Sequence, residues 1–137
     1  DYDKVIYDLG KKQIGLTNEI AAMKQKRTAY AAAAKHLQIC RTYKSVWMEY
    51  VAKPLNQKTE YFNQHSMELQ AYRTAAAKLE KEGIDQSVEI DKVNNLAQSL
   101  ERKINDLDKQ LRESNLQEQD YRQERKTLTT IQEDLFE

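Results

Sequence analysis

Residues 36–83 decide the fold, and they read HLQICRTYKSVWMEYVAKPLNQKTEYFNQHSMELQAYRTAAAKLEKEG. This stretch contains the only Trp, the only Cys and the only Pro of the 137-residue chain. On both sides of it, apolar residues recur at alternating intervals of three and four among many charged residues, which is the spacing of a coiled-coil seam. We therefore expect a packed centre that is flanked by long helices.

The composition predicts an all-α fold. Charged residues make up 32% of the chain, Pro occurs once and Gly occurs three times, so residues that break helices are rare. No alternating run of β-branched and aromatic residues reaches five positions, and such a run would be needed to predict a strand.

The pattern places three long helices at about residues 17–52, 54–82 and 86–135. Pro54 ends the first helix and suits the first turn of the second. Gly83 supplies a left-handed C-terminal cap, and Asp85 can then cap the third helix. The first helix is expected to start at about residue 17, because the glycines at positions 10 and 15 each cost about 1 kcal/mol in a helix interior.

Short turns join antiparallel neighbours, so the sequence predicts an antiparallel three-helix bundle or coiled coil of residues about 27–114 within a single helical domain, 1–137. Around Pro54 the expected neighbours include Ala34 with Tyr72. The residues before about 27 and after about 114 overhang, and we expect these ends to find a partner chain. The predicted core consists of apolar and aromatic residues on the facing seams: Leu37, Cys40, Trp47, Phe62, Leu69, Tyr72, Leu96, Leu100 and Leu107.

A second register pairs the first and third helices directly and folds the middle of the chain back on itself. It aligns the polar interruptions of the two seams as well as their apolar positions. Its pairs are Leu9 with Leu135, Leu16 with Leu128, Met23 with Tyr121, and Arg27 with Glu118.

The net charge is zero, but it is divided unevenly along the chain. Residues 1–58 contain 11 basic and 5 acidic residues, and the remainder contains 11 basic and 17 acidic residues. One interpretation is a basic helix that is neutralised by an acidic one; the other is a basic face that contacts nucleic-acid phosphates. The candidate DNA-phosphate contacts are Lys24, Lys26, Arg27, Lys35, Arg41, Lys44, Lys53 and Lys58.

The residues do not assemble into a recognisable catalytic, cofactor or metal site, so we expect neither enzyme activity nor a small-molecule substrate from this chain. Two His and one Cys do not give paired metal-ligand spacings, and three glycines do not form a phosphate-binding loop. Tyr43, Trp47 and Tyr50 could stack on bases, but their spacing favours packing in the core. The longest apolar run, 29–34, is too short for a membrane span, and a lone apolar-flanked Cys suggests a cytoplasmic protein. Since the chain begins at Asp1 without Met, we expect it to be a piece of a larger protein.

The run LQICRTYKSVWMEYVAK, followed by TEYFNQHSMELQAYRTAAAKLEKEG, resembles the helical C-terminal region of plasmid mobilisation relaxases. After Gly83 the chain has Ile-Asp-Gln-Ser where that family often has a Leu-Pro-Thr type of linker. The matching positions are Tyr43, Lys44, Val46 and Tyr50, then Phe62, His65, Glu68 and Leu69, then Ala75–Ala77 and Leu79.

The resemblance implies an accessory region that follows the nuclease domain of an enzyme that nicks and transfers one DNA strand. The family's catalytic tyrosine and metal-binding histidines lie in that nuclease domain, and no residue here matches them. Implied roles are DNA contact, binding to relaxosome proteins, or self-association. The alternative is a coiled-coil interaction module of an unrelated intracellular protein.

Overall fold

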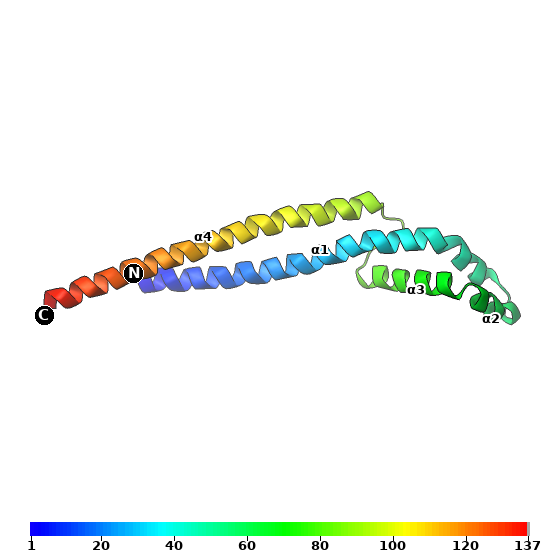
Figure 1. Cartoon of the computed structure of the whole chain (residues 1–137), viewed down its shortest axis with the longest axis horizontal. Coiled ribbons are helices and arrows are strands. Elements are labelled where there is room, and N and C mark those ends of the chain that lie inside the picture. The colour runs from blue at the N-terminus through cyan, green and yellow to red at the C-terminus, as the bar shows by residue number, and fades with distance from the viewer. Residues whose placement is uncertain (137) are drawn as a thin grey trace. The chain divides into compact units, whose positions relative to one another are not determined.

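A computed structural model describes residues 1–136 and shows four helices (Figure 1). They are α1 (Tyr2–Ala52), α2 (Leu55–Gln64), α3 (Ser66–Lys81) and α4 (Ile90–Phe136). The described residues contain no strand, so the predicted all-α helical bundle is confirmed. Contacts divide the chain into two compact units: unit 1 combines Asp1–Gln25 with Leu100–Glu137, and unit 2 is Lys26–Ser99.

The first helix begins at Tyr2 rather than at about residue 17. The side chain of Asp1 caps it, because its Oδ1 accepts a hydrogen bond from the backbone N–H of Asp3 at 3.1 Å. Gly10 and Gly15 lie inside the helix without interrupting it. Tertiary packing of the surrounding turns overrides their low helix propensity.

Unit 1 is an antiparallel pair formed by the start of α1 and most of α4. The rings of Tyr2 and Tyr121 lie 6.1 Å apart, and Gln13 Nε2 donates to Ser114 Oγ at 3.4 Å. The seam that these contacts mark continues beyond Gln13 toward the middle of α1. Its buried apolar residues are Ile6, Leu16, Ile20 and Ile104.

Two expectations for the ends of the chain are therefore wrong. Residues 1–25 do not overhang, because they pack against α4 within unit 1. The second register correctly paired the outer helices, but it placed Tyr121 beside Met23, whereas Tyr121 contacts Tyr2. Ser114, a small polar residue in this seam, is only 1% exposed.

Unit 2 encloses a core between α1, α3 and the first turns of α4. Its centre contains Leu37 and Cys40 of α1, Leu79 of α3 and Val93 of α4, all 2% exposed or less. The stacking of Tyr72 on Trp47, with ring centroids 4.9 Å apart, contradicts the predicted Ala34–Tyr72 pair. Ala34 lies 13 residues earlier in α1 than Trp47, which is about 20 Å along the helix.

The predicted core list is right for four residues and wrong for one. Leu37, Cys40, Leu69 and Tyr72 are buried, whereas Leu96 is 38% exposed. Trp47 packs against the core, and the other listed residues are half-buried. Leu100 and Leu107 belong to unit 1 while Phe62 and Leu69 belong to unit 2, so the single expected core is divided.

The predicted helix 54–82 is broken at His65. Its backbone, with φ −121° and ψ 29°, leaves the helical region and separates α2 from α3. The imidazole of His65 lies against the ring of Tyr61, with the ring centroids 4.4 Å apart. Its Nδ1 is 3.3 Å from Glu68 Oε2. These contacts hold the side chain between the two helices at the point where the backbone turns.

The C-terminal cap predicted at Gly83 is confirmed. Gly83 has φ +68°, and it donates its N–H to Glu80 O while Ile84 donates to Leu79 O, which is the Schellman pattern. Asp85 caps the turn that follows, with its Oδ1 accepting from the N–H of Ser87 at 2.8 Å. The last helix therefore begins at Ile90 rather than at about residue 86. Across residues 1–136, no helix combines the length and hydrophobicity needed to cross a membrane.

Candidate interaction surfaces

The eight candidate phosphate contacts are divided between the two units. Lys24 belongs to unit 1, whereas the other seven belong to unit 2. Lys26 and Lys35 are exposed, but they are nine residues apart in α1, about two and a half turns, and so project from opposite sides of the helix. Arg27 is half-buried.

Arg41 and Lys44 face an acidic loop of their own unit. Together with Asp85 and Glu89 they line a shallow hollow of about 430 Å³. Arg41 Nη2 donates to the backbone O of Val88 at 2.7 Å. The backbone hydrogen bond from Ser87 lowers the pKa of Asp85, so this loop is anionic at neutral pH. This arrangement favours intramolecular neutralisation for these two basic residues.

Lys58 and Lys53 serve the turn between α1 and α2. Lys58 Nζ donates to the carbonyl oxygens of Tyr50 at 2.9 Å and Val51 at 2.8 Å, which caps the C-terminus of α1. The same ammonium group lies 5.1 Å from the centroid of the Tyr50 ring, and Lys53 lies 5.2 Å from that of Tyr61. Both side chains therefore have structural partners within unit 2, and sequence reasoning missed this cap.

The aromatic residues considered as stacking platforms pack on one another. Trp47 is stacked on Tyr72 at an interplanar angle of 18°, and its ring also contacts Tyr50 at 5.6 Å. Tyr50 in turn lies 6.0 Å from Phe62. Burial, followed by a hydrogen bond to Glu49, raises the pKa of Tyr61 beside them. The rings form one cluster that holds α2 and α3 against α1.

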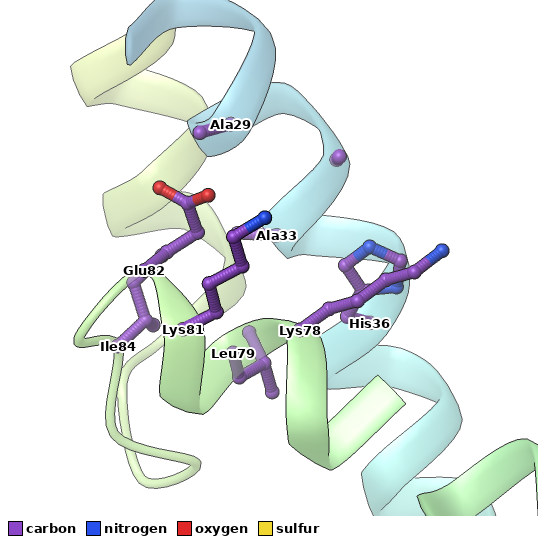
Figure 2. A pocket seen from close by; sticks show the side chains of 9 residues that line it. Ala29, Ala33, His36, Lys78, Leu79, Lys81, Glu82 and Ile84 are labelled. Atoms are coloured by element: carbon purple, nitrogen blue, oxygen red, sulfur yellow. The ribbon is translucent and has the colours of Figure 1, made fainter. Parts of the chain in front are cut away.

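A groove of about 230 Å³ lies between α1 and the end of α3 (Figure 2). Ala33 and Leu79 form part of its apolar lining, and Lys78 lies beside His36 at one end. Burial, then the charges of Lys78 and Lys35, lower the pKa of His36. The lining side chains include no hydroxyl or thiol, the groups that a histidine base ordinarily activates as nucleophiles.

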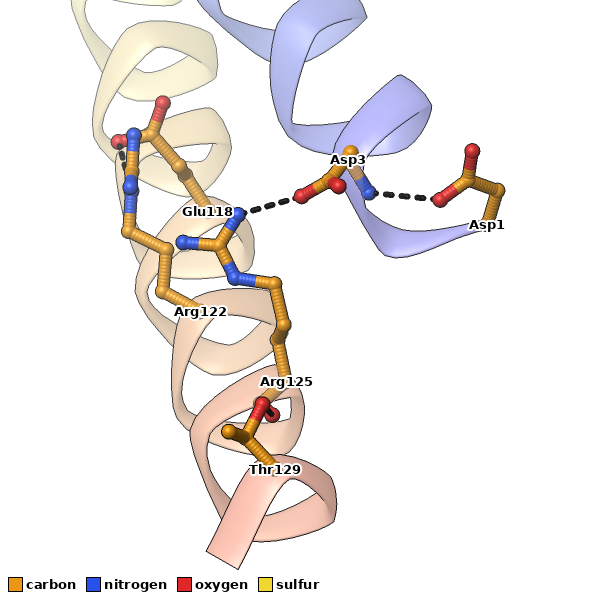
Figure 3. Close-up of polar contacts among 6 residues, drawn as sticks. All are labelled: Asp1, Asp3, Glu118, Arg122, Arg125 and Thr129. Carbon is orange, nitrogen blue, oxygen red and sulfur yellow. Dashed lines mark hydrogen bonds and ion pairs between the residues drawn. The ribbon is translucent and has the colours of Figure 1, made fainter. Parts of the chain in front are cut away.

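In unit 1 the beginning of α1 is tied to α4 by polar contacts (Figure 3). Arg125 Nη1 lies 2.6 Å from Asp3 Oδ1, although both side chains are largely exposed. One turn earlier, Arg122 pairs with Glu118 at 3.5 Å. A hydrogen bond to Glu124 raises the pKa of Tyr2 in the same region. The Arg122–Glu118 pair lies within α4, whereas the contact of Arg125 with Asp3 joins α4 to the beginning of α1.

Beside this seam, unit 1 exposes a second apolar face on α1. Tyr7 and Ile14 are each 65% exposed, and Gly10 lies between them. Two adjoining hollows of about 420 and 490 Å³ share Gly10 and Ile14 as lining residues and extend toward α4. Sequence analysis missed this face, although a repeat at positions 7, 10, 14, 17 and 21 runs one residue out of phase with the buried repeat at 6, 9, 13, 16 and 20.

No group of three or more His, Cys, Asp or Glu side chains that could hold a metal ion occurs among residues 1–136. Burial raises the pKa of the Cys40 thiol, which favours the protonated form over the reactive thiolate. The chain matches no protein-family model, no curated protein and no solved structure.

Proposed function

We propose that this chain is the accessory helical region of a DNA relaxase that acts in plasmid mobilisation. The supporting observation is that the residues that resemble the relaxase region all belong to one compact unit. Tyr50 contacts Phe62, Trp47 beside them stacks on Tyr72, and Leu69 and Leu79 are each 1% exposed. The shared pattern is therefore a pattern of packing positions, as expected when two proteins have the same helical hairpin.

Within such a protein, the region would serve assembly more than DNA contact. Of the eight basic residues, Arg41, Lys53 and Lys58 have partners inside unit 2. Unit 1 exposes apolar side chains at helical spacing, which is a property of a helix that binds another helix. The binding partners of this surface would be relaxosome proteins or further copies of the chain.

The proposal that the chain belongs to a relaxase is tested by determining the coding sequence upstream of Asp1. The proposal expects a nuclease domain with a three-histidine metal site and a catalytic tyrosine. An upstream sequence without such a domain would refute it and leave the alternative, a coiled-coil interaction module of an unrelated protein. The heptad seam of unit 1 suits that alternative equally well, since it specifies a helix pair and no chemistry.

The chain itself should not cut DNA, because the nicking chemistry would belong to the nuclease domain. Purified chain incubated with supercoiled plasmid and Mg²⁺ or Mn²⁺ is expected to leave the plasmid intact. Nicking that co-purifies with the chain through two columns would contradict the proposal.

A DNA-contact role is tested separately by titrating labelled duplex and single strand at two salt concentrations. These cations should bind DNA only weakly, with a dissociation constant of about 10⁻⁴ to 10⁻⁶ M at physiological salt. The affinity should fall steeply as the salt concentration rises. Replacing Lys24, Lys26 and Lys35 by Glu should then abolish binding without loss of helicity. If the wild type does not bind even at low salt, the charge division serves intramolecular neutralisation alone.

A further inference from the structure

We propose that the second apolar face of unit 1 binds the same face of another copy of the chain, with the two α1 helices antiparallel. We define this face, the outer stripe, by Tyr7, Gly10, Ile14, Thr17 and Ala21. The inference is independent of the relaxase proposal, because it uses only the geometry of unit 1.

The outer stripe has the spacing of a complete seam, and Tyr7, Ile14, Thr17 and Ala21 are exposed among residues 1–136. Its positions alternate by three and four residues, as in a coiled coil. Tyr7 and Ile14 are each 65% exposed, although the neighbouring Ile6 and Leu16 are buried at 7% and 8%. A helix with two adjacent seams is typical of bundles in which each helix contacts more than one other helix.

Gly10 gives an independent reason to expect close approach by another helix. A glycine inside a helix costs about 1 kcal/mol relative to Ala. An added Cβ at this position would meet no atom within 4 Å, so no contact inside the chain requires a glycine there. A second helix that crosses the stripe at Gly10 would use the missing side chain, because small residues let two backbones come together.

The sizes and charges of the residues along α1 indicate which partner binds the outer stripe. In an antiparallel pair centred on Ile14, the large Tyr7 of one copy lies opposite the small Ala21 of the other, and Gly10 lies opposite Thr17 or Asn18. Residues 1–8 contain three acidic residues and one basic residue, whereas residues 9–24 contain three basic residues and one acidic residue. An antiparallel pair places the acidic end of each helix beside the basic part of the other, and a parallel pair would place like charges together.

Light scattering coupled to gel filtration of the full chain tests the pairing. The expected result is a species of twice the 16.1 kDa monomer that dissociates on dilution. Ile14→Glu should shift the mass to that of the monomer while circular dichroism shows unchanged helicity, because Ile14 is exposed in the single chain. Leu116→Glu, at a 60% exposed residue of α4 in the same unit, is the matched control and should remain dimeric.

Two further variants separate this surface from other modes of association. Gly10→Ala should raise the thermal midpoint of a dilute, monomeric sample and yet weaken dimerisation. A mixture of Tyr7→Cys and Ala21→Cys chains should form a disulfide-linked heterodimer under mild oxidation, which a parallel pair cannot do. A monomeric wild type at about 100 μM, a dimer that survives Ile14→Glu, or failure of the mixed crosslink would each overturn the inference.

Discussion

Unit 2 and unit 1 share α1 and α4 but bury the apolar residues of α1 to different degrees. In unit 2, Leu37, Leu69 and Leu79 are at most 1% exposed. In unit 1, the best buried residues of α1 retain 6–8% exposure, and Ile14 on the same helix is 65% exposed. The side chains of α1 are therefore buried more completely in unit 2 than in unit 1.

The difference follows from the number of helical segments around each core. Unit 2 surrounds its core with α1, α3 and the first turns of α4, and the Trp47–Tyr72 stack closes one end. Unit 1 contains only two segments, so each helix buries a single seam and leaves its flanks in solvent. A pair of helices cannot cover a stripe as wide as the one that α1 presents.

The largest expected effect comes from removing a core side chain of unit 2. Leu69→Ala should lower the free energy of unfolding by about 2–5 kcal/mol, because it leaves a cavity at a residue that is 1% exposed. Urea denaturation followed by circular dichroism measures the change. Leu116→Ala in unit 1 is the control and should cost less than about 0.5 kcal/mol. Equal costs at the two positions would contradict the contrast between the units.

Replacement of a left-handed glycine and of a helical glycine by Ala should change the free energy of unfolding in opposite directions. Each change should be of intermediate size. Gly83→Ala should destabilise the chain by about 1–2 kcal/mol, since an L side chain at φ +68° is strained. Gly15→Ala should instead stabilise it by up to about 1 kcal/mol, because Gly15 is helical and no atom lies near its missing Cβ. Thermal denaturation of both variants compares them directly, and a destabilising Gly15→Ala would show that unit 1 needs this glycine.

A smaller loss is expected where α2 caps α1 in unit 2. Lys58→Met keeps most of the apolar stem but removes the hydrogen bonds to the carbonyl oxygens of Tyr50 and Val51. The expected cost is about 1 kcal/mol, the usual net value of such bonds. Lys44→Met is the control at an exposed position of α1. Equal stability of the two variants would show that Lys58 contributes no cap in solution.

The sequence predicted those parts of the fold that depend on local chemistry. Gly83 could be assigned as a left-handed cap because only glycine adopts that conformation without strain, and Pro54 could be assigned as the end of α1. The burial of Leu37, Cys40 and Leu69 followed from the width of the apolar stripe. Each of these assignments depends on one residue type and its immediate neighbours.

The parts that failed depend on long-range choices that heptad sequences leave nearly degenerate. A seam of apolar residues accepts several registers, and the one adopted is marked by the polar pairs Gln13 with Ser114 and Asp3 with Arg125. The break at His65 involves no Pro or Gly, so no local signal announced it. Likewise, Asp85 can cap a turn or a helix, and the sequence does not distinguish them. The intramolecular partners of Arg41, Lys53 and Lys58 could not be predicted for the same reason, because they are known only once the helices are placed.

The smallest effect concerns pH, and it should be confined to unit 2, which contains both histidines of the chain. Burial and the charge of Lys78 lower the pKa of His36 in the folded chain below its ordinary value near 6.5. The unfolded chain therefore binds a proton at His36 more readily than the folded chain does. The stabilising contribution of neutral His36 is fully present above the unfolded pKa and is lost as the pH falls through the folded pKa. Unfolding free energies at pH 7.5 and pH 5 should differ less for His36→Gln than for the wild type, with Lys78→Gln between them. An identical pH dependence in all three proteins would show that His36 stays solvated in the folded chain.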